Sequence, residues 1–257
     1  MRWSTIAPRL QASLGLLLFG FALAVVVPEL SGYFRAGVWQ GLVLPPWSCW
    51  GVAIAATLLS YGAIACYDLL AFIYLGYGLD RRKICFTGLL TYSLSPSLGF
   101  PFLSAGAIRY RFYSSWGVPP LTIAQIIVFS NATLWVGLCG VAGLALWLHP
   151  LPLPPQLTLP LEIAHLGGLG LILTALYLGF CAVGDRRLPS IPVALGQLLT
   201  FALDWGGAAI ALYGLLEISP KLAFGPFFGI YSLAMVVGLL STVPGGLGVL
   251  ETVMLFF

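Results

Sequence analysis

Apolar residues run through this chain in long stretches, separated by short segments that carry prolines, glycines and most of the charges. The stretches do not alternate with the period of two that a half-buried strand requires, and many approach the 20 or so residues that cross a hydrocarbon core as a helix. We therefore expect an all-α, polytopic integral membrane bundle, and not a β-barrel, whose strands alternate over about 10 residues. The predicted spans are residues 14–27, 50–77, 121–148, 161–183, 191–214 and 224–240.

The first apolar run could also be a signal peptide, because Arg2 and Arg9 precede it. The small residues of a cleavage site do not follow it, and Pro28 stands there instead. We predict a retained first helix with a cytoplasmic N-terminus. Residues 29–44 mix aromatic, charged and apolar side chains, which suits an amphipathic segment in the outer interface.

Composition supports the membrane prediction. The 257 residues are 60% hydrophobic and only 7% charged, with a mean hydropathy of +1.02, whereas soluble domains carry about 25% charged residues. The basic residues cluster in short loops, which indicates contact with anionic lipid and not with nucleic acid. The cysteines and histidines stand apart from one another, so we predict free thiols, no metal site and no cofactor.

The loop charges also predict an orientation. Residues 80–83 and 185–187 hold Arg and Lys clusters, which favour the cytoplasm, and the uncharged, proline-rich residues 149–160 then lie outside. Together these loops predict a multi-pass membrane protein.

This orientation places Arg109 and Arg111 on the cytoplasmic side, so residues 84–108 must cross the membrane twice or not at all. Two helical crossings need about 20 residues each, which is more than this segment holds. We predict a re-entrant hairpin whose tip, near residues 95–99, includes Ser97 and Gly99.

The two halves of the chain echo each other. Asp68 and Asp204 each lie in the middle of an apolar run, and both begin the pattern Asp-x8-Tyr-Gly. Each is followed by a segment broken by proline and glycine, and the loop charges give the two helices opposite directions. Such broken segments in opposed halves point to an inverted repeat with a site at the membrane midplane.

We therefore treat residues 1–257 as a single membrane domain with halves of about 1–118 and 119–257. The last apolar run, residues 251–257, is too short for a span. We expect that further helices belong after it and are missing from this chain.

The break in the second half is the more pronounced of the two. It contains Pro244, Gly245, Gly246 and, five residues after Gly246, Glu251. Proline removes a backbone donor, and glycine allows positive φ and close approach of another backbone. At membrane depth the freed groups need protein or water as partners. We expect this break to form one wall of a lipid cavity that Glu251 faces, where Glu251 binds a headgroup amine or caps the exposed backbone donors.

Four charged residues upstream are candidates for the same site. An ionised Asp at the bilayer centre costs about 2.5–3.5 kcal/mol, so Asp68 and Asp204 should face the interior, where they bind a cationic headgroup or a proton or make a structural hydrogen bond. Arg109 and Arg111 could hold a lipid phosphate or only anchor the chain at the inner interface. Their i, i+2 spacing lets at most one of them point inward.

Several of these motifs together resemble a known family. The chain resembles the bacterial phosphatidylglycerol lysyltransferase family, also called multiple peptide resistance factor, in its N-terminal membrane domain. The resemblance covers essentially the whole chain and is most specific in its last motif. It departs at Ser95-Pro96-Ser97, where Asn-type residues are expected. The matching residues are Leu98-Gly99-Phe100, Ala105 to Tyr113, Trp116-Gly117, Asp204-Trp205, Leu212 to Leu216 and Val243 to Glu251.

The resemblance implies a function. In that family a cytoplasmic domain transfers lysine or alanine from aminoacyl-tRNA to phosphatidylglycerol, and the membrane domain is a flippase that moves the product to the outer leaflet, which gives resistance to cationic peptides. This chain lacks the transferase domain and has no catalytic constellation, so we expect no covalent chemistry from it. The resemblance also implies a location in the bacterial cytoplasmic (inner) membrane. The implied partners are the membrane, an anionic or aminoacylated phospholipid and, as an option, a second copy of the chain in a homodimer. The alternatives are a substrate-presenting anchor and a transporter of another lipid-linked substrate.

Overall fold

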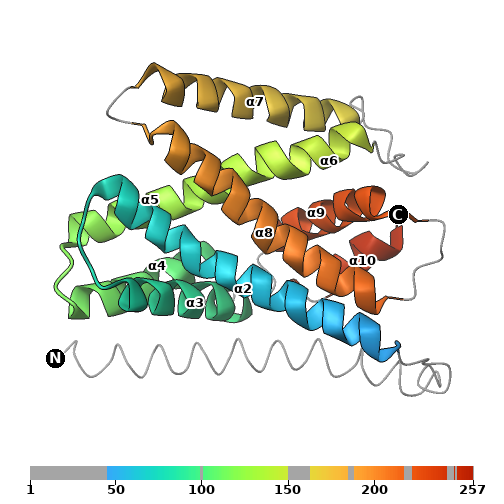
Figure 1. Cartoon of the computed structure of the whole chain (residues 1–257), viewed down its shortest axis with the longest axis horizontal. Coiled ribbons are helices and arrows are strands. Elements are labelled where there is room, and N and C mark those ends of the chain that lie inside the picture. The colour runs from blue at the N-terminus through green and yellow to red at the C-terminus, as the bar shows by residue number, and fades with distance from the viewer. Residues whose placement is uncertain are drawn as a thin grey trace, which may run out of the picture.

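The computed structural model describes residues 45–98, 101–149, 163–184, 188–216, 222–241, 246 and 248–256, which are helical and contain no strand. This confirms an all-α, polytopic membrane bundle (Figure 1). The predicted elements at residues 14–27 and 29–44 lie outside the described residues. The helices are α2 (Trp47–Leu75), α3 (Arg81–Leu98), α4 (Pro101–Ser115), α5 (Pro120–Gly137), the π-helix η2 (Leu138–Ala142), α6 (Gly143–Leu148), α7 (Ile163–Val183), α8 (Ile191–Leu215), α9 (Phe224–Ser241) and α10 (Val249–Phe256).

Four helical stretches in the described part are long and apolar enough to cross a membrane, and their bounds lie within a few residues of the predicted ones. They are Trp47–Leu75, Pro120–Leu148, His165–Val183 and Ile191–Leu215. Local chemistry sets some of the ends. Pro120 occupies the first helical turn, where its missing N–H costs nothing. Gly76 ends α2 in the left-handed conformation with φ of 62°, which glycine adopts without strain.

The span from α5 to α6 contains a feature that the hydropathy pattern did not predict. A π-helical turn, η2, interrupts it at Leu138–Ala142. Directly before this turn, the backbone of Gly137 touches the ring of Phe201 on α8 so closely that a Cβ on Gly137 would overlap the ring. Insertions of this kind are frequent at functional sites. Hydropathy averages over a whole helix and does not register one extra residue in a turn.

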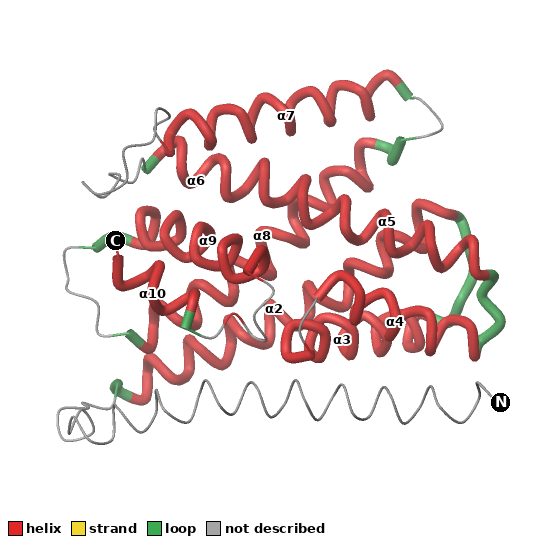
Figure 2. Tube along the Cα trace, turned by 180° about the vertical axis from the view of Figure 1, so that it is seen from behind, coloured by secondary structure: helices red, strands yellow, loops and turns green. Residues whose placement is uncertain are grey.

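Helices α2 and α8 form the centre of the bundle and run antiparallel along each other (Figures 1 and 2). A glycine on α8 allows the close approach. A Cβ on Gly207 would lie 2.8 Å from the carbonyl oxygen of Ala56 and 3.2 Å from the amide nitrogen of Ser60. Farther along the pair, a Cβ on Gly196 would lie 3.0 Å from Leu70. The opposite directions of the two Asp-bearing helices, which the sequence predicted, are therefore present.

Two helical hairpins pack against this central pair from opposite ends (Figure 1). The first is α3 with α4, and the second is α9 with α10. At about 1.5 Å per residue the 18 residues of α3 extend about 27 Å, which is short of a full crossing. The predicted re-entrant hairpin after α2 therefore exists as two short antiparallel helices.

The tip of the first hairpin lies later than predicted. Helix α3 continues through Pro96 to Leu98, so the turn falls between Leu98 and Pro101, and Gly99 lies outside the described residues. Pro96 has no N–H to donate to the carbonyl oxygen of Tyr92, so α3 loses one hydrogen bond there and ends two residues later. The hydroxyl of Ser104 on α4 donates to the carbonyl oxygen of Ser95 at 3.1 Å, which provides one partner for the chain end that the turn exposes.

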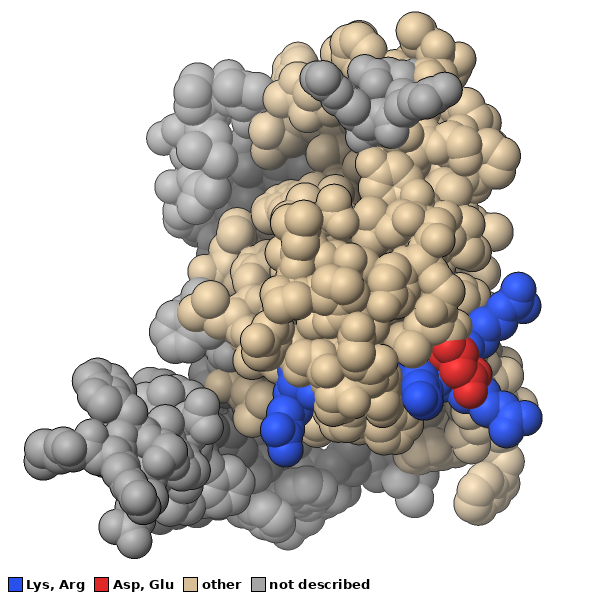
Figure 3. Space-filling model, turned by 90° about the vertical axis from the view of Figure 1, so that its left-hand side faces the viewer, with Lys and Arg blue, Asp and Glu red and all other residues tan. Residues whose placement is uncertain are grey.

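The charges gather at the end of the bundle where α3 begins (Figure 3). Among the described residues, every Lys and Arg except Arg109 lies exposed at the start of α3 or near the end of α4. The four are Arg81, Arg82, Lys83 and Arg111, and Asp80 stands beside the first three. The first hairpin thus enters the bundle from its positively charged end, and the second hairpin enters from the other.

The packing of α2 on α8 makes a prediction about two adjacent glycines. Gly207→Ala should lower the thermal unfolding midpoint in detergent, because its Cβ meets the α2 backbone and overpacking costs about 1–3 kcal/mol. Gly206→Ala is the matched control, since nothing lies within 4 Å of its Cβ position. It should keep or raise the midpoint. Equal midpoints for the two variants would contradict the described contact.

Candidate functional site

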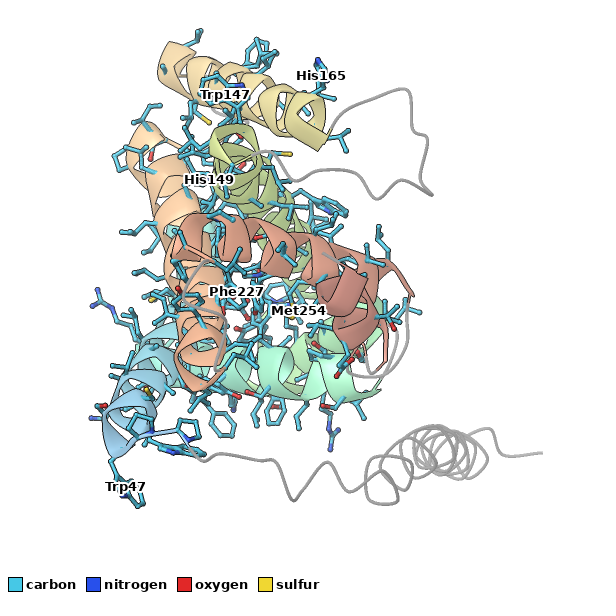
Figure 4. The ribbon with its side chains drawn as sticks, turned by 90° about the vertical axis from the view of Figure 1, so that its right-hand side faces the viewer. Trp47, Trp147, His149, His165, Phe227 and Met254 are labelled. Carbon is cyan, nitrogen blue, oxygen red and sulfur yellow. The ribbon has the colours of Figure 1, made fainter. Side chains whose placement is uncertain are left out.

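A cavity of about 230 Å³ lies where the two hairpins meet the central helix pair. It is lined from both halves of the chain, and its polar walls come from α2, α3, α4, α5, α8 and α9. Figure 4 looks into the bundle from the right-hand end of Figure 1, with Phe227 of α9 and Met254 of α10 inside and Trp47 at the outer edge. The polar and aromatic lining residues are Tyr67, Tyr92, Ser95, Phe102, Arg109, Ser130, Asn131, Asp204, Trp205 and Tyr231.

The first of the two repeated aspartates is fully paired. Arg109 donates from Nη2 to Oδ1 of Asp68 at 2.7 Å and from Nε to Oδ2 at 3.1 Å, a fork-to-fork ion pair. Tyr113 donates to Oδ2 at 2.7 Å and Ser130 to Oδ1 at 3.1 Å. The side chains of Asp68 and Arg109 are 0% and 1% exposed. This cluster ties the first hairpin to α2 and α5, so Asp68 serves structure.

A column of aromatic rings connects this ion pair with the second aspartate. The guanidinium of Arg109 lies 5.0 Å from the ring centroid of Tyr92, within the range of a cation–π contact. The ring of Tyr92 lies 4.9 Å from that of Tyr67. Tyr67 in turn donates from its hydroxyl to Oδ2 of Asp204 at 3.2 Å. Two tyrosine rings therefore stand between the arginine and Asp204.

Asp204 has hydroxyl partners but no ion pair within the described part of the chain. Ser60 donates to its Oδ1 at 2.9 Å, and Tyr67 donates to its Oδ2. Its side chain lines the cavity and is partly exposed, whereas that of Asp68 is fully buried. The charges of Asp68 and Arg109 cancel, so an ionised Asp204 gives the cavity one net negative charge. The repeated aspartates thus have different roles.

Comparison with known proteins gives relatives but no matching family model. The chain is 39% identical over 267 residues to the Synechocystis protein described as uncharacterized protein slr0712, covering 99% of this chain and 82% of that one. It is 30% identical over 212 residues to inner membrane protein YbhN of Escherichia coli, covering 78% of this chain and 66% of YbhN. The chain belongs to the slr0712 family of membrane proteins. These relatives show that the chain is a membrane protein, and their descriptions name no lipid substrate.

The other predicted site residues do not join the cavity. Arg111 is exposed on the outer side of α4, while Arg109 points inward, as their spacing required. Ser97 is exposed near the tip of the first hairpin. Glu251 is exposed and accepts a hydrogen bond from the backbone N–H of Gly248 at 2.8 Å. The expectation that Glu251 faces the cavity is therefore wrong, because its carboxylate caps the start of α10.

The glycine break has the geometry that the sequence suggested at the residues that are described. Gly246 has φ of 64° and Gly248 has φ of 78°, which disfavour any side chain. A Cβ on Gly246 would lie 3.5 Å from Cα of Gly238 on α9, so the break approaches that helix closely. Pro244 and Gly245 lie outside the described residues.

Sequence reasoning missed the hydroxyl groups that shape the site. Tyr113 follows Arg109 by one helical turn, so both could be expected on one face toward Asp68. Ser60 and Tyr67 are likewise two turns apart on α2, a spacing that places both on the face of α2 toward Asp204 of α8. The contact between the rings of Tyr67 and Tyr92 could not be predicted from the sequence, because it depends on how the first hairpin packs against α2.

The contrast between the two aspartates predicts opposite stability effects. Asp68→Asn should lower the free energy of unfolding by about 3–5 kcal/mol, because it leaves Arg109 buried without a counter-charge. Asp204→Asn should change it little, since the amide keeps its hydroxyl neighbours and leaves no buried counter-charge without a partner. Thermal or denaturant unfolding in detergent measures both. A loss of stability in Asp204→Asn as large as in Asp68→Asn would overturn the distinction.

Proposed function

We propose that this chain is a lipid-translocation domain that moves aminoacylated phosphatidylglycerol, with a lysyl or alanyl headgroup, to the outer leaflet of the bacterial inner membrane. Such transport would lower the negative surface charge and give resistance to cationic antimicrobial peptides. The single observation that carries the proposal is the cavity between two opposed hairpins, whose unbalanced charge is that of Asp204. The resemblance to the phosphatidylglycerol lysyltransferase family supports the choice of lipid, as the aminoacyl group supplies an ammonium.

In this proposal Asp204 binds the ammonium of the headgroup. Its carboxylate has lone pairs left after accepting from Ser60 and Tyr67, and a charge-assisted hydrogen bond to an ammonium would complete them. Tyr67, Tyr92 and Tyr231 also line the cavity with aromatic faces that attract cations. Arg109 is a weaker candidate for the lipid phosphate than the sequence suggested, because Asp68 already occupies its fork.

The arrangement of the hairpins favours translocation over a role as a substrate-presenting anchor. An anchor needs access from one leaflet, whereas α3–α4 and α9–α10 enter from opposite ends and meet at one cavity. Broken segments of opposed halves that face a central site are typical of alternating access. We place the end with Arg81, Arg82 and Lys83 in the cytoplasm by the positive-inside rule.

Leaflet-resolved labelling of lysyl-phosphatidylglycerol in proteoliposomes tests the proposal. A membrane-impermeant amine reagent reports the lipid that reaches the outside. Asp204→Asn should slow its appearance by roughly 10-fold or more, because a hydrogen bond to a charged group contributes about 1.5–3 kcal/mol.

Two exposed residues outside the cavity provide matched controls. Arg111→Gln and Glu251→Gln each remove one charge without touching the lining, so both should transport like the unmodified chain. Unchanged transport in Asp204→Asn at equal reconstitution would reject Asp204 as the ammonium site. No transport by the unmodified chain would reject the function itself.

A further inference from the structure

Asp204 poses an electrostatic problem that Asp68 does not. Both lie in the middle of membrane helices, where an ionised carboxylate costs about 2.5–3.5 kcal/mol. Asp68 offsets this cost with Arg109 and two hydroxyl donors. Within the described part of the chain, the donors to Asp204 are the hydroxyls of Ser60 and Tyr67. When the cavity holds no cationic headgroup, something else must neutralise Asp204.

The groups that face Asp204 do not supply the missing charge. The titratable side chains that line the cavity with it are Tyr67 from α2, Tyr92 from α3, Arg109 from α4 and Tyr231 from α9. The tyrosines are neutral at ordinary pH. The guanidinium of Arg109 is committed to Asp68, and the rings of Tyr92 and Tyr67 stand between it and Asp204. Because no unpaired cation among the described residues faces Asp204, we expect the neutralising cation to arrive through the cavity.

We propose that Asp204 carries a proton while the cavity is empty and releases it when an ammonium group binds, which makes the proton the counter-ion of transport. The proposal rests on the function proposed above and adds the energy source. In the exchange the O–H bond of the carboxylic acid breaks, the proton passes to water, and the carboxylate accepts an N–H from the ammonium. One positive charge leaves the site as another enters, so the cavity stays neutral throughout.

A proton fits this site better than a metal ion. A cation such as Ca²⁺ takes about 6–8 oxygen ligands, whereas the wall around Asp204 is largely apolar and aromatic, with Ile64, Trp205 and Met235 among its residues. A proton needs one acceptor. The Ser60 contact of 2.9 Å serves either protonation state, because a hydroxyl both donates and accepts.

The coupling has a direction if the outer side is the more acidic one. The headgroup would leave Asp204 when the cavity opens outward, and a proton from outside would replace it. On return to the inward-open state, a new ammonium group would displace that proton into the cytoplasm. A proton gradient would thus draw aminoacylated lipid outward, one proton for each lipid whose ammonium group binds Asp204.

Proton release on lipid binding tests the exchange directly. The purified full chain in phosphatidylcholine nanodiscs, in weak buffer with a pH indicator, is given lysyl-phosphatidylglycerol or phosphatidylglycerol, and bound lipid is counted by native mass spectrometry. Near pH 5, lysyl-phosphatidylglycerol should release about one proton per bound lipid, and phosphatidylglycerol none. Asp204→Asn should abolish the release, while Asp204→Glu and Arg111→Gln should retain it. Binding of the lysyl lipid without proton release would overturn the proposal.

A second measurement needs no lipid, and it distinguishes a failure of the proton proposal from a failure of the proposed lipid substrate. The infrared difference between the unmodified chain and Asp204→Asn should show the carbonyl stretch of a protonated carboxyl group in lipid-free protein. If this band is absent across the acidic to neutral range, the proton proposal is wrong whatever the lipid does. If the band is present but lysyl-phosphatidylglycerol does not bind, the protonated Asp204 stands, and both the proposed substrate and its exchange for the proton are rejected.

Discussion

The ion pair between Asp68 and Arg109 is the contact on which the site depends. Hairpin α3–α4 is too short to cross a membrane and has no lipid-spanning length to hold it in place. The buried pair joins α4 to α2, and Ser130 adds α5 to the same cluster. A buried pair contributes less to stability than its geometry suggests, because both charges lose their hydration. Its importance lies in the cost of separating the partners, which keeps the hairpin tip at the cavity.

The difference between the two halves follows from this pair. Both halves consist of a long helix with a central aspartate followed by a helical hairpin. In the first half Arg109 pairs with Asp68 of the same half. The hairpin α9–α10 has no Arg or Lys among its described residues that could pair with Asp204. Among the described residues, Asp204 is therefore the acidic side chain that lines the cavity without an ion pair. In a symmetrical arrangement with two ion pairs, the cavity would have no charge with which to select a headgroup.

Much of the fold could be predicted because the membrane imposes strict rules. Apolar lengths set the spans, and loop charges required residues 84–108 to turn back, which the hairpin α3–α4 confirms. The inward direction of Asp68 and Asp204 followed from the cost of a charge in lipid. The tip of the hairpin lies later than predicted because Pro96 removes one hydrogen bond near the end of α3 without ending the helix, which continues to Leu98.

The site was less predictable, because its partners are chosen by packing between segments far apart in the chain. Neither the pairing of Arg109 with Asp68 nor the hydroxyl of Ser60 on Asp204 has a local sequence signature. Glu251 illustrates the reverse case. A local hydrogen bond to Gly248, three residues earlier, decided its place, and its separation from the cavity is a consequence of that cap.

The contact between the lipid headgroup and Asp204 decides whether this cavity selects aminoacylated lipid, and a structure of the full chain in nanodiscs with lysyl-phosphatidylglycerol would show it. The lipid ammonium should lie within hydrogen-bond distance of Asp204, with Arg109 still paired to Asp68. A lipid phosphate on Arg109, with Asp68 displaced and Asp204 unoccupied, would contradict it.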